Sequence, residues 1–239
     1  MRALALHPEV LLATSAVWQT NCTIVRGPVD REGKGAGEAF VIDSPVLPDE
    51  LDALPTLLEQ SGFPSPSGLL ATHGDWDHLL GRLAFPGLAL GCAESTAERL
   101  RASPGEAQRE LRAFDKGLLI ERPRPLALGS VQALPVPGRC GIGDHELELH
   151  PADGHTVDGM AVWIPWACVL VVGDYLSTVE PPTLNDGGGD RDAYLATLER
   201  LRPLVASAEH IVPGHGPVLN AERALEVLEE NVASLTQAT

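Results

Sequence analysis

Residues 72–78, with the sequence Thr-His-Gly-Asp-Trp-Asp-His, hold four side chains that commonly bind metals: His73, Asp75, Asp77 and His78. Neutral imidazoles and carboxylates are the ligands that hold zinc, iron or manganese in proteins. The segment follows the apolar run Gly-Leu-Leu-Ala at residues 68–71, and a strand that ends in a loop can direct several ligands to one point. We therefore predict a metal site here. The alternative is a polar turn in which Asp75 or Asp77 caps the following helix.

Three further candidate ligands each come directly after a glycine at the end of a strand-like segment. They are His155, Asp174 and His215. His155 follows an alternating segment that turns at Pro151 and Gly154, Asp174 ends a continuous apolar run, and His215 follows a short apolar strand. A glycine before each ligand lets the backbone adopt conformations closed to other residues and approach an ion closely.

The ordered set of motifs resembles that of the metallo-β-lactamase fold family of hydrolases, over residues 73–215. The first motif of that family reads His-x-His-x-Asp-His and is followed by a lone His, a bridging Asp and a last His. The first motif of this chain reads His-x-Asp-x-Asp-His. The departure is Asp75, which stands where most relatives have His. The flavodiiron oxidoreductases of the family are similar in having a carboxylate there, but it is Glu rather than Asp.

The resemblance implies two divalent metal ions. Zinc is the first candidate, and the carboxylate at position 75 favours iron or manganese as alternatives, because it is a hard ligand. The resemblance implies that one ion is held by His73, Asp75 and His155, the second by Asp77, His78 and His215, and that Asp174 bridges them. It also implies a catalytic role for Asp77, which would orient or deprotonate the water between the ions. Thr72 or Thr156 is placed to support the ligand histidines through hydrogen bonds.

The ligand set predicts a dinuclear metal-dependent hydrolase. Two ions a few Å apart lower the pKa of a shared water toward about 7, and the bridging hydroxide attacks a carbonyl or phosphoryl centre. Two ions, three aspartates and a hydroxide are formally neutral together, whereas His at position 75 would leave one positive charge. One charge about 5 Å from a substrate anion is worth roughly 3 kcal/mol at an effective dielectric near 20. The sequence therefore favours a small ester, thioester or lactone over a phosphodiester.

Other functions remain open at this point. A phosphoesterase of the same fold would use the same ligands. The carboxylate at position 75 suggests a metal-dependent oxidoreductase of the di-iron type, although a flavodiiron enzyme needs a flavin-binding partner and we expect no flavodoxin-like segment after Thr239. A non-catalytic sensor that retains the metal pocket is disfavoured, because no ligand position is lost.

Substrate contacts are predicted from neighbours of the ligands. Tyr175, next to Asp174, is placed to donate a hydrogen bond to a substrate oxyanion, with aromatic core packing as the alternative. Residues 180–189 could form a rim over the metals or a solvated connector. Trp18 and Trp76 either line an apolar pocket or pack in the core.

Composition predicts one globular domain over residues 1–239 with a small-molecule substrate. The chain has 239 residues, 44% of them hydrophobic, and a formal net charge of −16. Nucleic acids and anionic membranes are bound chiefly by Lys and Arg, and only Lys34 and Lys116 are lysines here. We therefore expect neither kind of partner. No apolar run approaches the roughly 20 residues of a membrane span, and the N-terminus does not read as a signal peptide.

The cysteines predict a cytoplasmic location. Cys22, Cys92, Cys140 and Cys168 are widely spaced and show no Cys-x-x-Cys pairing. We expect buried free thiols, as in a reducing cytoplasm, with Cys168 in the core.

The elements that must position the ligands can be predicted from the hydrophobic pattern. Residues 11–14, 22–25 and 39–42 predict a β-meander with a Gly-rich turn over 27–37. A helix over 49–60 should be kinked or split by Pro55. A second helix should start with Ser103 as its cap and Pro104 as its first residue, and run to about Asp115.

The second half repeats this plan. Strands are predicted over 146–149, 161–164 and 168–172, and helices over 190–201 and after the cap Asn220. The last helix carries one apolar stripe for core packing: Leu225, Leu228, Val232 and Leu235. Two such halves predict an α/β fold, a four-layer αββα sandwich of two mixed sheets flanked by helices, which the resemblance also implies.

Overall fold

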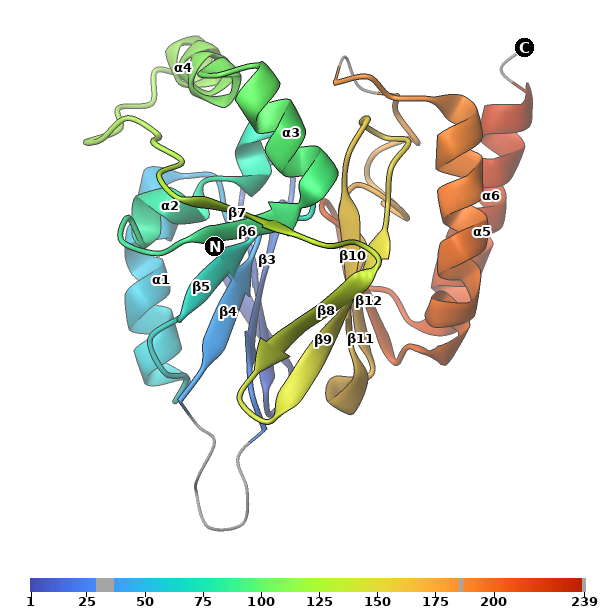
Figure 1. The fold of residues 1–239 in the computed structure, drawn as a ribbon, viewed down its shortest axis with the longest axis horizontal. Coiled ribbons are helices and arrows are strands. Elements are labelled where there is room, and N and C mark those ends of the chain that lie inside the picture. The colour runs from blue at the N-terminus through green and yellow to red at the C-terminus, as the bar shows by residue number, and fades with distance from the viewer. Residues whose placement is uncertain (29–36, 185–186, 238–239) are drawn as a thin grey trace.

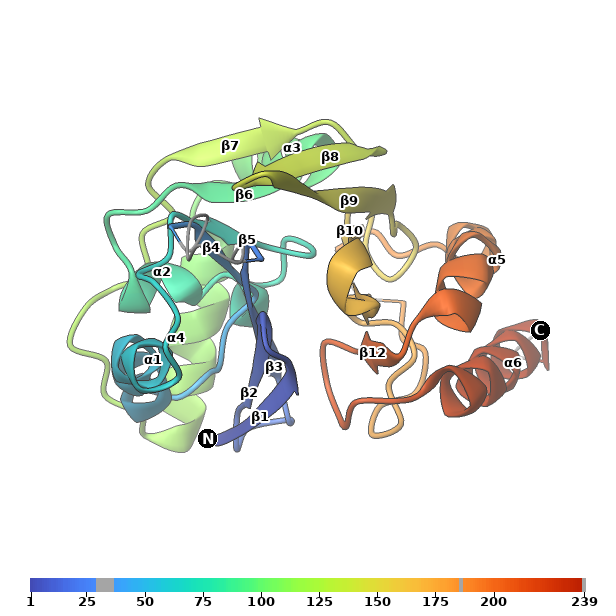
Figure 2. The same cartoon turned by 90° about the horizontal axis from the view of Figure 1, so that it is seen from below.

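Two mixed sheets pack face to face in the computed structural model, which describes residues 1–28, 37–184 and 187–237 (Figures 1 and 2). The seven strands of the first sheet lie in chain order. They are β1 (Arg2–His7), β2 (Val10–Thr14), β3 (Asn21–Arg26), β4 (Ala39–Ile42), β5 (Gly68–Leu70), β6 (Leu90–Ala93) and β7 (Val131–Leu134). Strands β1 to β4 form an antiparallel meander, and β4 to β7 are parallel.

The second sheet has five strands in the order β12-β11-β10-β9-β8. They are β8 (Gly138–Ile142), β9 (His145–Pro151), β10 (Met160–Ile164), β11 (Val169–Val171) and β12 (His210–Val212). Strand β10 is antiparallel to both β9 and β11, and β12 is parallel to β11. Strands β9, β11 and β12 therefore run in the same direction and end at the same edge of the sheet.

Helices cover the outer face of each sheet (Figure 2). The first sheet is covered by α1 (Pro48–Gln60), α2 (Gly81–Ala84), α3 (Glu94–Ala102) and α4 (Glu106–Leu118). The second is covered by α5 (Arg191–Ser207) and α6 (Ala221–Gln237). Two short 3-10 helices, η1 (Trp76–His78) and η2 (Pro165–Ala167), complete the described elements.

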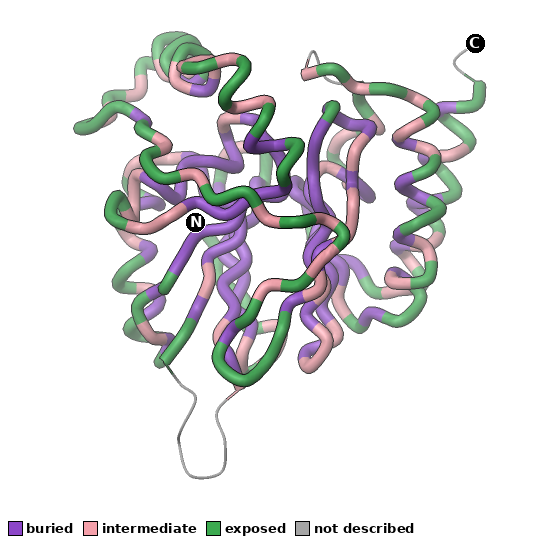
Figure 3. The backbone as a smooth tube through the Cα atoms, viewed as in Figure 1, coloured by how far each residue is buried: buried purple, intermediate pink, exposed green. Residues whose placement is uncertain are grey.

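Three hydrophobic cores separate the four layers. Strand β2 is buried along its whole length because its alternate side chains serve two of them. Leu11 and Ala13 pack toward the helices of the first half, whereas Val10 and Leu12 pack between the sheets. The third core lies between the second sheet and helices α5 and α6. Figure 3 shows the result, with buried backbone concentrated in the strands. The predicted αββα sandwich of two mixed sheets is confirmed.

Most predicted elements are present, with corrections at helix ends. Helix α1 is continuous through Pro55, so the predicted split is wrong; its apolar face, which includes Leu51 and Leu54, packs on the first sheet. The predicted cap Ser103 ends α3, and α4 starts at Glu106. Strands β1, β6, β7 and β8 and helix α3 were not predicted.

The C-terminal helices follow their predicted signals. Asn220 Oδ1 accepts a hydrogen bond from Arg223 N (2.9 Å), and the stripe of α6 packs into the third core. All four cysteines are unpaired, but Cys168 is only half-buried at the turn before β11, not in the core as predicted. Of the predicted turn over residues 27–37, residues 29–36 lie outside the described part. No helix in the described ranges is long and apolar enough to cross a bilayer.

Candidate metal centre

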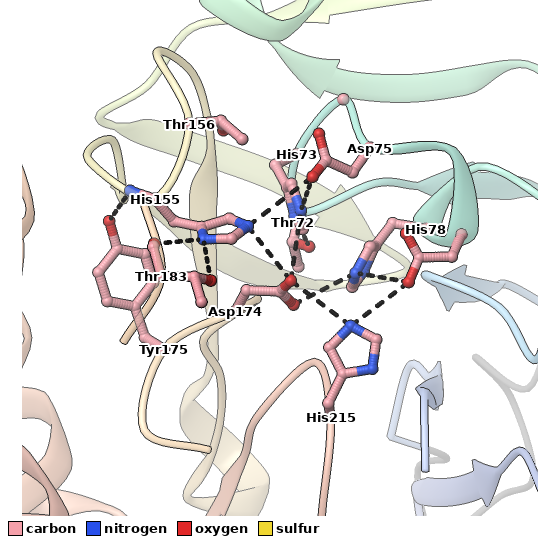
Figure 4. Close-up of polar contacts among 12 residues, drawn as sticks. Thr72, His73, Asp75, His78, His155, Thr156, Asp174, Tyr175, Thr183 and His215 are labelled. Atoms are coloured by element: carbon pink, nitrogen blue, oxygen red, sulfur yellow. Dashed lines mark hydrogen bonds and ion pairs between the residues drawn. The ribbon is translucent and has the colours of Figure 1, made fainter. Parts of the chain in front are cut away.

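The seven predicted ligands lie on four loops that follow strands at one end of the sandwich. His73, Asp75, Asp77 and His78 follow β5 and continue into η1. The other three follow β9, β11 and β12, whose ends meet at one edge because the strands share a direction. Folding therefore brings residues up to 142 positions apart in the sequence to one point, as Figure 4 shows.

The ligands form two groups with Asp174 between them. In the first cluster, His73, Asp75 and His155, the Oδ2 atom of Asp75 lies 3.6 Å from His73 Nε2 and 3.7 Å from His155 Nε2. In the second cluster, Asp77, His78 and His215, the Oδ2 atom of Asp77 lies 3.7 Å from His78 Nε2 and 3.3 Å from His215 Nε2.

Asp174 contacts the imidazoles of both clusters. Its Oδ2 lies 3.7 Å from His73 Nε2, 3.4 Å from His155 Nε2 and 3.4 Å from His215 Nε2. Its Oδ1 lies 3.2 Å from His78 Nε2. The structure thus brings the seven residues together, and a further group within ligand range, His73, His78 and Asp174, crosses the two clusters.

These separations fit metal ions. Ligand atoms about 2.1 Å from one tetrahedral ion lie about 3.4 Å from each other, whereas direct N–H···O hydrogen bonds are 2.7–3.2 Å long. The Nε2 atoms of His73, His78 and His155 and the Oδ1 atom of Asp174 are buried without a hydrogen-bond partner. Buried polar atoms are rarely left so, and these four all border the same small space. The donor set therefore suits two divalent cations.

The other ring nitrogen of each histidine is held by the protein. His73 Nδ1 lies 3.1 Å from Thr72 Oγ1, His155 Nδ1 lies 2.9 Å from the Thr183 carbonyl, and His215 Nδ1 lies 3.2 Å from Thr20 Oγ1. Such contacts fix the ring orientation and leave Nε2 for the metal. Thr72 has the predicted supporting role. Thr156 does not, since its hydroxyl donates to the Asp158 carbonyl.

Asp43, which was not singled out from the sequence, orients the fourth histidine. It follows β4, the parallel neighbour of β5, so it reaches the loop that carries the first motif. Its Oδ2 lies 3.1 Å from His78 Nδ1, and its two oxygens accept hydrogen bonds from Thr72 N (2.8 Å) and Thr72 Oγ1 (2.9 Å). The sequence feature that could have identified Asp43 is its position directly after a predicted strand.

Glycines before the ligands permit the close approach that was predicted. Gly154 has φ +125°, where side chains are strained. A Cβ atom on Gly214 would overlap Asp174 Oδ1 and crowd His78 Cε1. The backbone before His215 can therefore lie against the Asp174 carboxylate only because residue 214 lacks a side chain.

Carboxylates dominate the electrostatics of the metal-free site. Burial alone would lower the pKa values of His78, His155 and His215, but the neighbouring aspartates outweigh it and raise all three, that of His215 to about 10. Burial likewise opposes ionisation of Asp75, yet the facing imidazoles of His155 and His73 and the charge of Arg99 hold its pKa well below the usual range. Cations would replace the protons of these imidazoles on binding.

The charge of Asp75 is offset by Arg99, which changes the sequence-based charge count. Arg99, on α3, donates to Asp75 Oδ1 (2.7 Å) and to Asp158 Oδ1 (2.9 Å). Asp158 is fully buried, and its Oδ2 accepts from Gly74 N (2.9 Å). The guanidinium therefore ties the loop of the first motif to the loop of His155 and leaves Asp75 Oδ2 to face the imidazoles.

A cavity of about 680 Å³ opens onto the ligands. Six of its described lining residues are carboxylates and one is a guanidinium: Asp75, Asp77, Asp174, Glu106, Glu110, Glu180 and Arg99. Trp18, 47% exposed, and Trp76 also line it and pack on Phe114. The loop after Asp174 lines it with Glu180, Thr183, Leu184 and Gly187, in agreement with a rim over residues 180–189; residues 185 and 186 lie outside the described part.

Tyr175 does not face this cavity, so its predicted contact with substrate is corrected. The side chain is 2% exposed. Its hydroxyl donates to the Asp153 carbonyl (2.7 Å) and accepts from His155 N (3.1 Å), and its ring packs on that of Tyr194. Tyr175 therefore supports the loop of His155 from the core.

The fold and the two-cluster site define a metal-binding αββα protein. Comparison of the sequence with known protein families identifies the family. Residues 16–215 match the metallo-beta-lactamase superfamily, and the chain belongs to it. No curated protein sequence matches the chain significantly.

Solved structures share the fold at low sequence identity. A metallo-beta-lactamase from Pontibacter korlensis is 18% identical with a TM-score of 0.67, over 100% of this chain and 99% of that one. A metallo-beta-lactamase family protein from Thermus thermophilus is 20% identical with a TM-score of 0.72, over 98% and 82%. The protein TTHA1623, in a di-iron-bound form, is 21% identical with a TM-score of 0.63, over 90% and 97%.

Proposed function

We propose that the protein is a dinuclear metal-dependent hydrolase of small esters, thioesters or lactones, with zinc as the first candidate metal and iron or manganese as alternatives. One structural observation is the main support for this proposal. Unpartnered imidazole nitrogens and carboxylate oxygens converge, at separations that suit two cations, next to an open cavity. The superfamily is largely one of metal-dependent hydrolases, which agrees with this chemistry.

When bound, two divalent ions polarise a substrate oxygen and lower the pKa of water. Asp77 lines the cavity with its Oδ2 atom 3.3 Å from His215 Nε2, so it can hold one ion and accept the proton of the attacking water. Thr72, Thr20 and Asp43 keep the imidazoles oriented throughout. Trp18 and Trp76 offer an apolar wall to the uncharged part of a substrate.

The charges around the cavity support a neutral or weakly charged substrate. Burial first, and then the charges of nearby carboxylates, raise the pKa values of Glu110 and Glu180, although Arg99 lowers that of Glu110 and His215 lowers that of Glu180. Arg99, the one guanidinium among the described residues that line the cavity, is already bound to Asp75 and Asp158. A phosphodiester would thus meet six carboxylates at the cavity, and the described lining offers it no cationic side chain without a carboxylate partner. We accordingly propose a small-molecule substrate in the cytoplasm, and neither nucleic acid nor membrane as partner.

The test is a substrate panel measured against metal content. Protein stripped with chelator is reloaded with zero, one or two equivalents of zinc, iron or manganese and assayed on esters, thioesters, lactones and phosphodiesters. We expect turnover of an ester, thioester or lactone that rises with the second equivalent. Exclusive turnover of phosphodiesters would favour the phosphoesterase alternative, and no turnover with any metal would refute the proposal.

A di-iron oxidoreductase is the second candidate, because three of the seven ligands are carboxylates and hard oxygen ligands suit iron. The likeness to a protein solved with two irons agrees with this reading at the level of the fold. Iron-loaded protein that consumes oxygen in the presence of a reductant, without hydrolysing the panel, would favour it. Hydrolysis without oxygen consumption would exclude it.

A further inference from the structure

Three glutamates line the cavity outside the seven predicted ligands. Glu106 and Glu110 belong to α4, whereas Glu180 lies on the loop after Asp174. Within the described part of the chain, none of their carboxylates forms a hydrogen bond or an ion pair. Their positions relative to the ligands nevertheless differ.

Glu180 alone of the three approaches a cluster. One carboxylate oxygen of Glu180, one of Asp174 and a ring nitrogen of His215 all lie within 4.8 Å of one another, so they could share an ion. Among the described residues, neither Glu106 nor Glu110 belongs to such a group. Glu180 therefore extends the second cluster on the side of the cavity, whereas the α4 glutamates are outside ligand range.

The loop holds Glu180 in this position. The Ser177 hydroxyl accepts hydrogen bonds from Val179 N (3.2 Å) and Glu180 N (3.1 Å), which forms a tight turn that begins three residues after Asp174. The side chain of Glu180 is half-buried and extends from this turn toward the cavity. The turn thus holds the backbone of Glu180 close to Asp174, and no described residue hydrogen-bonds to the Glu180 carboxylate.

We propose that Glu180 is an additional, displaceable ligand of the ion held by Asp77, His78 and His215, an inference that rests on the proposed dinuclear site. With it, that ion has two imidazoles and three carboxylates around it, counting Asp174. An oxygen-rich set suits manganese or iron better than zinc. Because Glu180 reaches the ion from the cavity, a substrate that binds this ion must move the carboxylate aside.

The experiment is a chelator-competition titration of the metal-free protein with Zn²⁺ and with Mn²⁺. Glu180→Gln keeps the size of the side chain and removes its charge, and Glu110→Gln is the matched control at the same cavity. Loss of a partner that merely supports a ligand typically costs 10–100-fold in metal affinity. We expect Glu180→Gln to lower the binding affinity for one of the two ions by at least about tenfold. The loss should be larger for Mn²⁺ than for Zn²⁺. The Mn²⁺ electron paramagnetic resonance spectrum should change in the same variant.

Glu110→Gln should leave affinities and spectrum as in the wild type, and circular dichroism should report an intact fold in both variants. Unchanged affinities in Glu180→Gln would overturn the inference. An equal loss of metal affinity in both variants would overturn it too. The loss would then result from the charge around the cavity and not from ligation of the ion by Glu180. Wild-type protein that binds a single ion would contradict the dinuclear function instead, and Glu180→Gln would still report whether Glu180 holds that ion.

Discussion

Replacing Asp75 by His should shift the substrate preference of the protein toward anions. Asp75 belongs to the first cluster, and its Oδ1 accepts from Arg99 at 2.7 Å. Asp75→His removes one negative charge from the cavity and leaves Arg99 with Asp158 as its one remaining carboxylate partner. The charge near a bound substrate therefore rises by one unit. The adjacent Arg99 guanidinium also loses one of the two carboxylates that balance its charge.

The size of the shift follows from Coulomb's law. One charge about 5 Å from a substrate anion is worth about 3 kcal/mol at an effective dielectric of 20, which sets an upper limit of about 100-fold. Screening over a Debye length of about 8 Å reduces this to about 2 kcal/mol, or about 30-fold. The second substitution Arg99→Gln removes the positive charge again. Asp75→His/Arg99→Gln should therefore return to within a few-fold of the wild-type preference.

The measurement is the ratio of kcat/KM for a phosphodiester to kcat/KM for a neutral ester or lactone, at matched metal occupancy. Arg101→Gln is the control, since Arg101 is an exposed arginine on the same helix, α3, and does not line the cavity. A ratio in Asp75→His that is unchanged, or that moves toward the neutral substrate, would refute the electrostatic argument. A double variant that keeps the ratio of Asp75→His would show that Arg99 does not offset this charge.

Three further predictions test the centre. Elemental analysis of protein purified without chelator should approach two metal equivalents per chain, and a plateau at one under metal excess would contradict the two-cluster site. Asp174→Ala and His215→Ala should each lower turnover by at least about 100-fold, because metal chemistry supplies several kcal/mol, while circular dichroism stays as in the wild type; normal turnover would show that the second cluster is wrongly assigned. The pKa of His215 is raised to about 10 in the metal-free protein, so its stabilising effect is complete below the unfolded value of about 6.5 and is lost as pH rises toward 10. The Tm of chelated protein should therefore fall over that range, a fall that His215→Gln should reduce.

The clustering of the seven candidate ligands could be predicted from the sequence because each residue is placed by local signals. An apolar strand, a glycine and a metal-binding side chain recur at His155, Asp174 and His215, and strand direction then brings their ends together. Most strands of the inner core could be predicted for the same reason, although β6, which is buried along its whole length, was not. Strands β7 and β8 were missed because they lie at sheet edges, where half-exposed residues give no clear alternation. The start of α4 was misplaced because Ser103-Pro104 carries the signature of a helix start while it ends α3.

The supporting residues could not be predicted, because their roles depend on contacts between elements. Asp43 follows β4 and reaches His78 only because β4 and β5 are parallel neighbours. Tyr175 is adjacent to a ligand in the sequence, yet side chains at successive positions point in different directions, and its hydroxyl binds backbone groups in the core. Adjacency along the chain is therefore weaker evidence for a substrate contact than for a supporting role.

Arg99 illustrates why the net charge of a metal centre is a property of the fold and not of its ligand motif. Counting Asp75 with two ions gives a neutral centre, but the count changes when Arg99, 24 positions later on another element, donates to the same carboxylate. Asp158, buried 59 positions beyond Arg99, is what holds the guanidinium there. The Asp75–Arg99 pair can therefore stand in for a neutral imidazole in charge while presenting an oxygen to the metal. That combination lets Asp75 contribute an oxygen to the metal preference, while Arg99 and the α4 glutamates at the cavity, Glu106 and Glu110, determine the charge that a substrate meets.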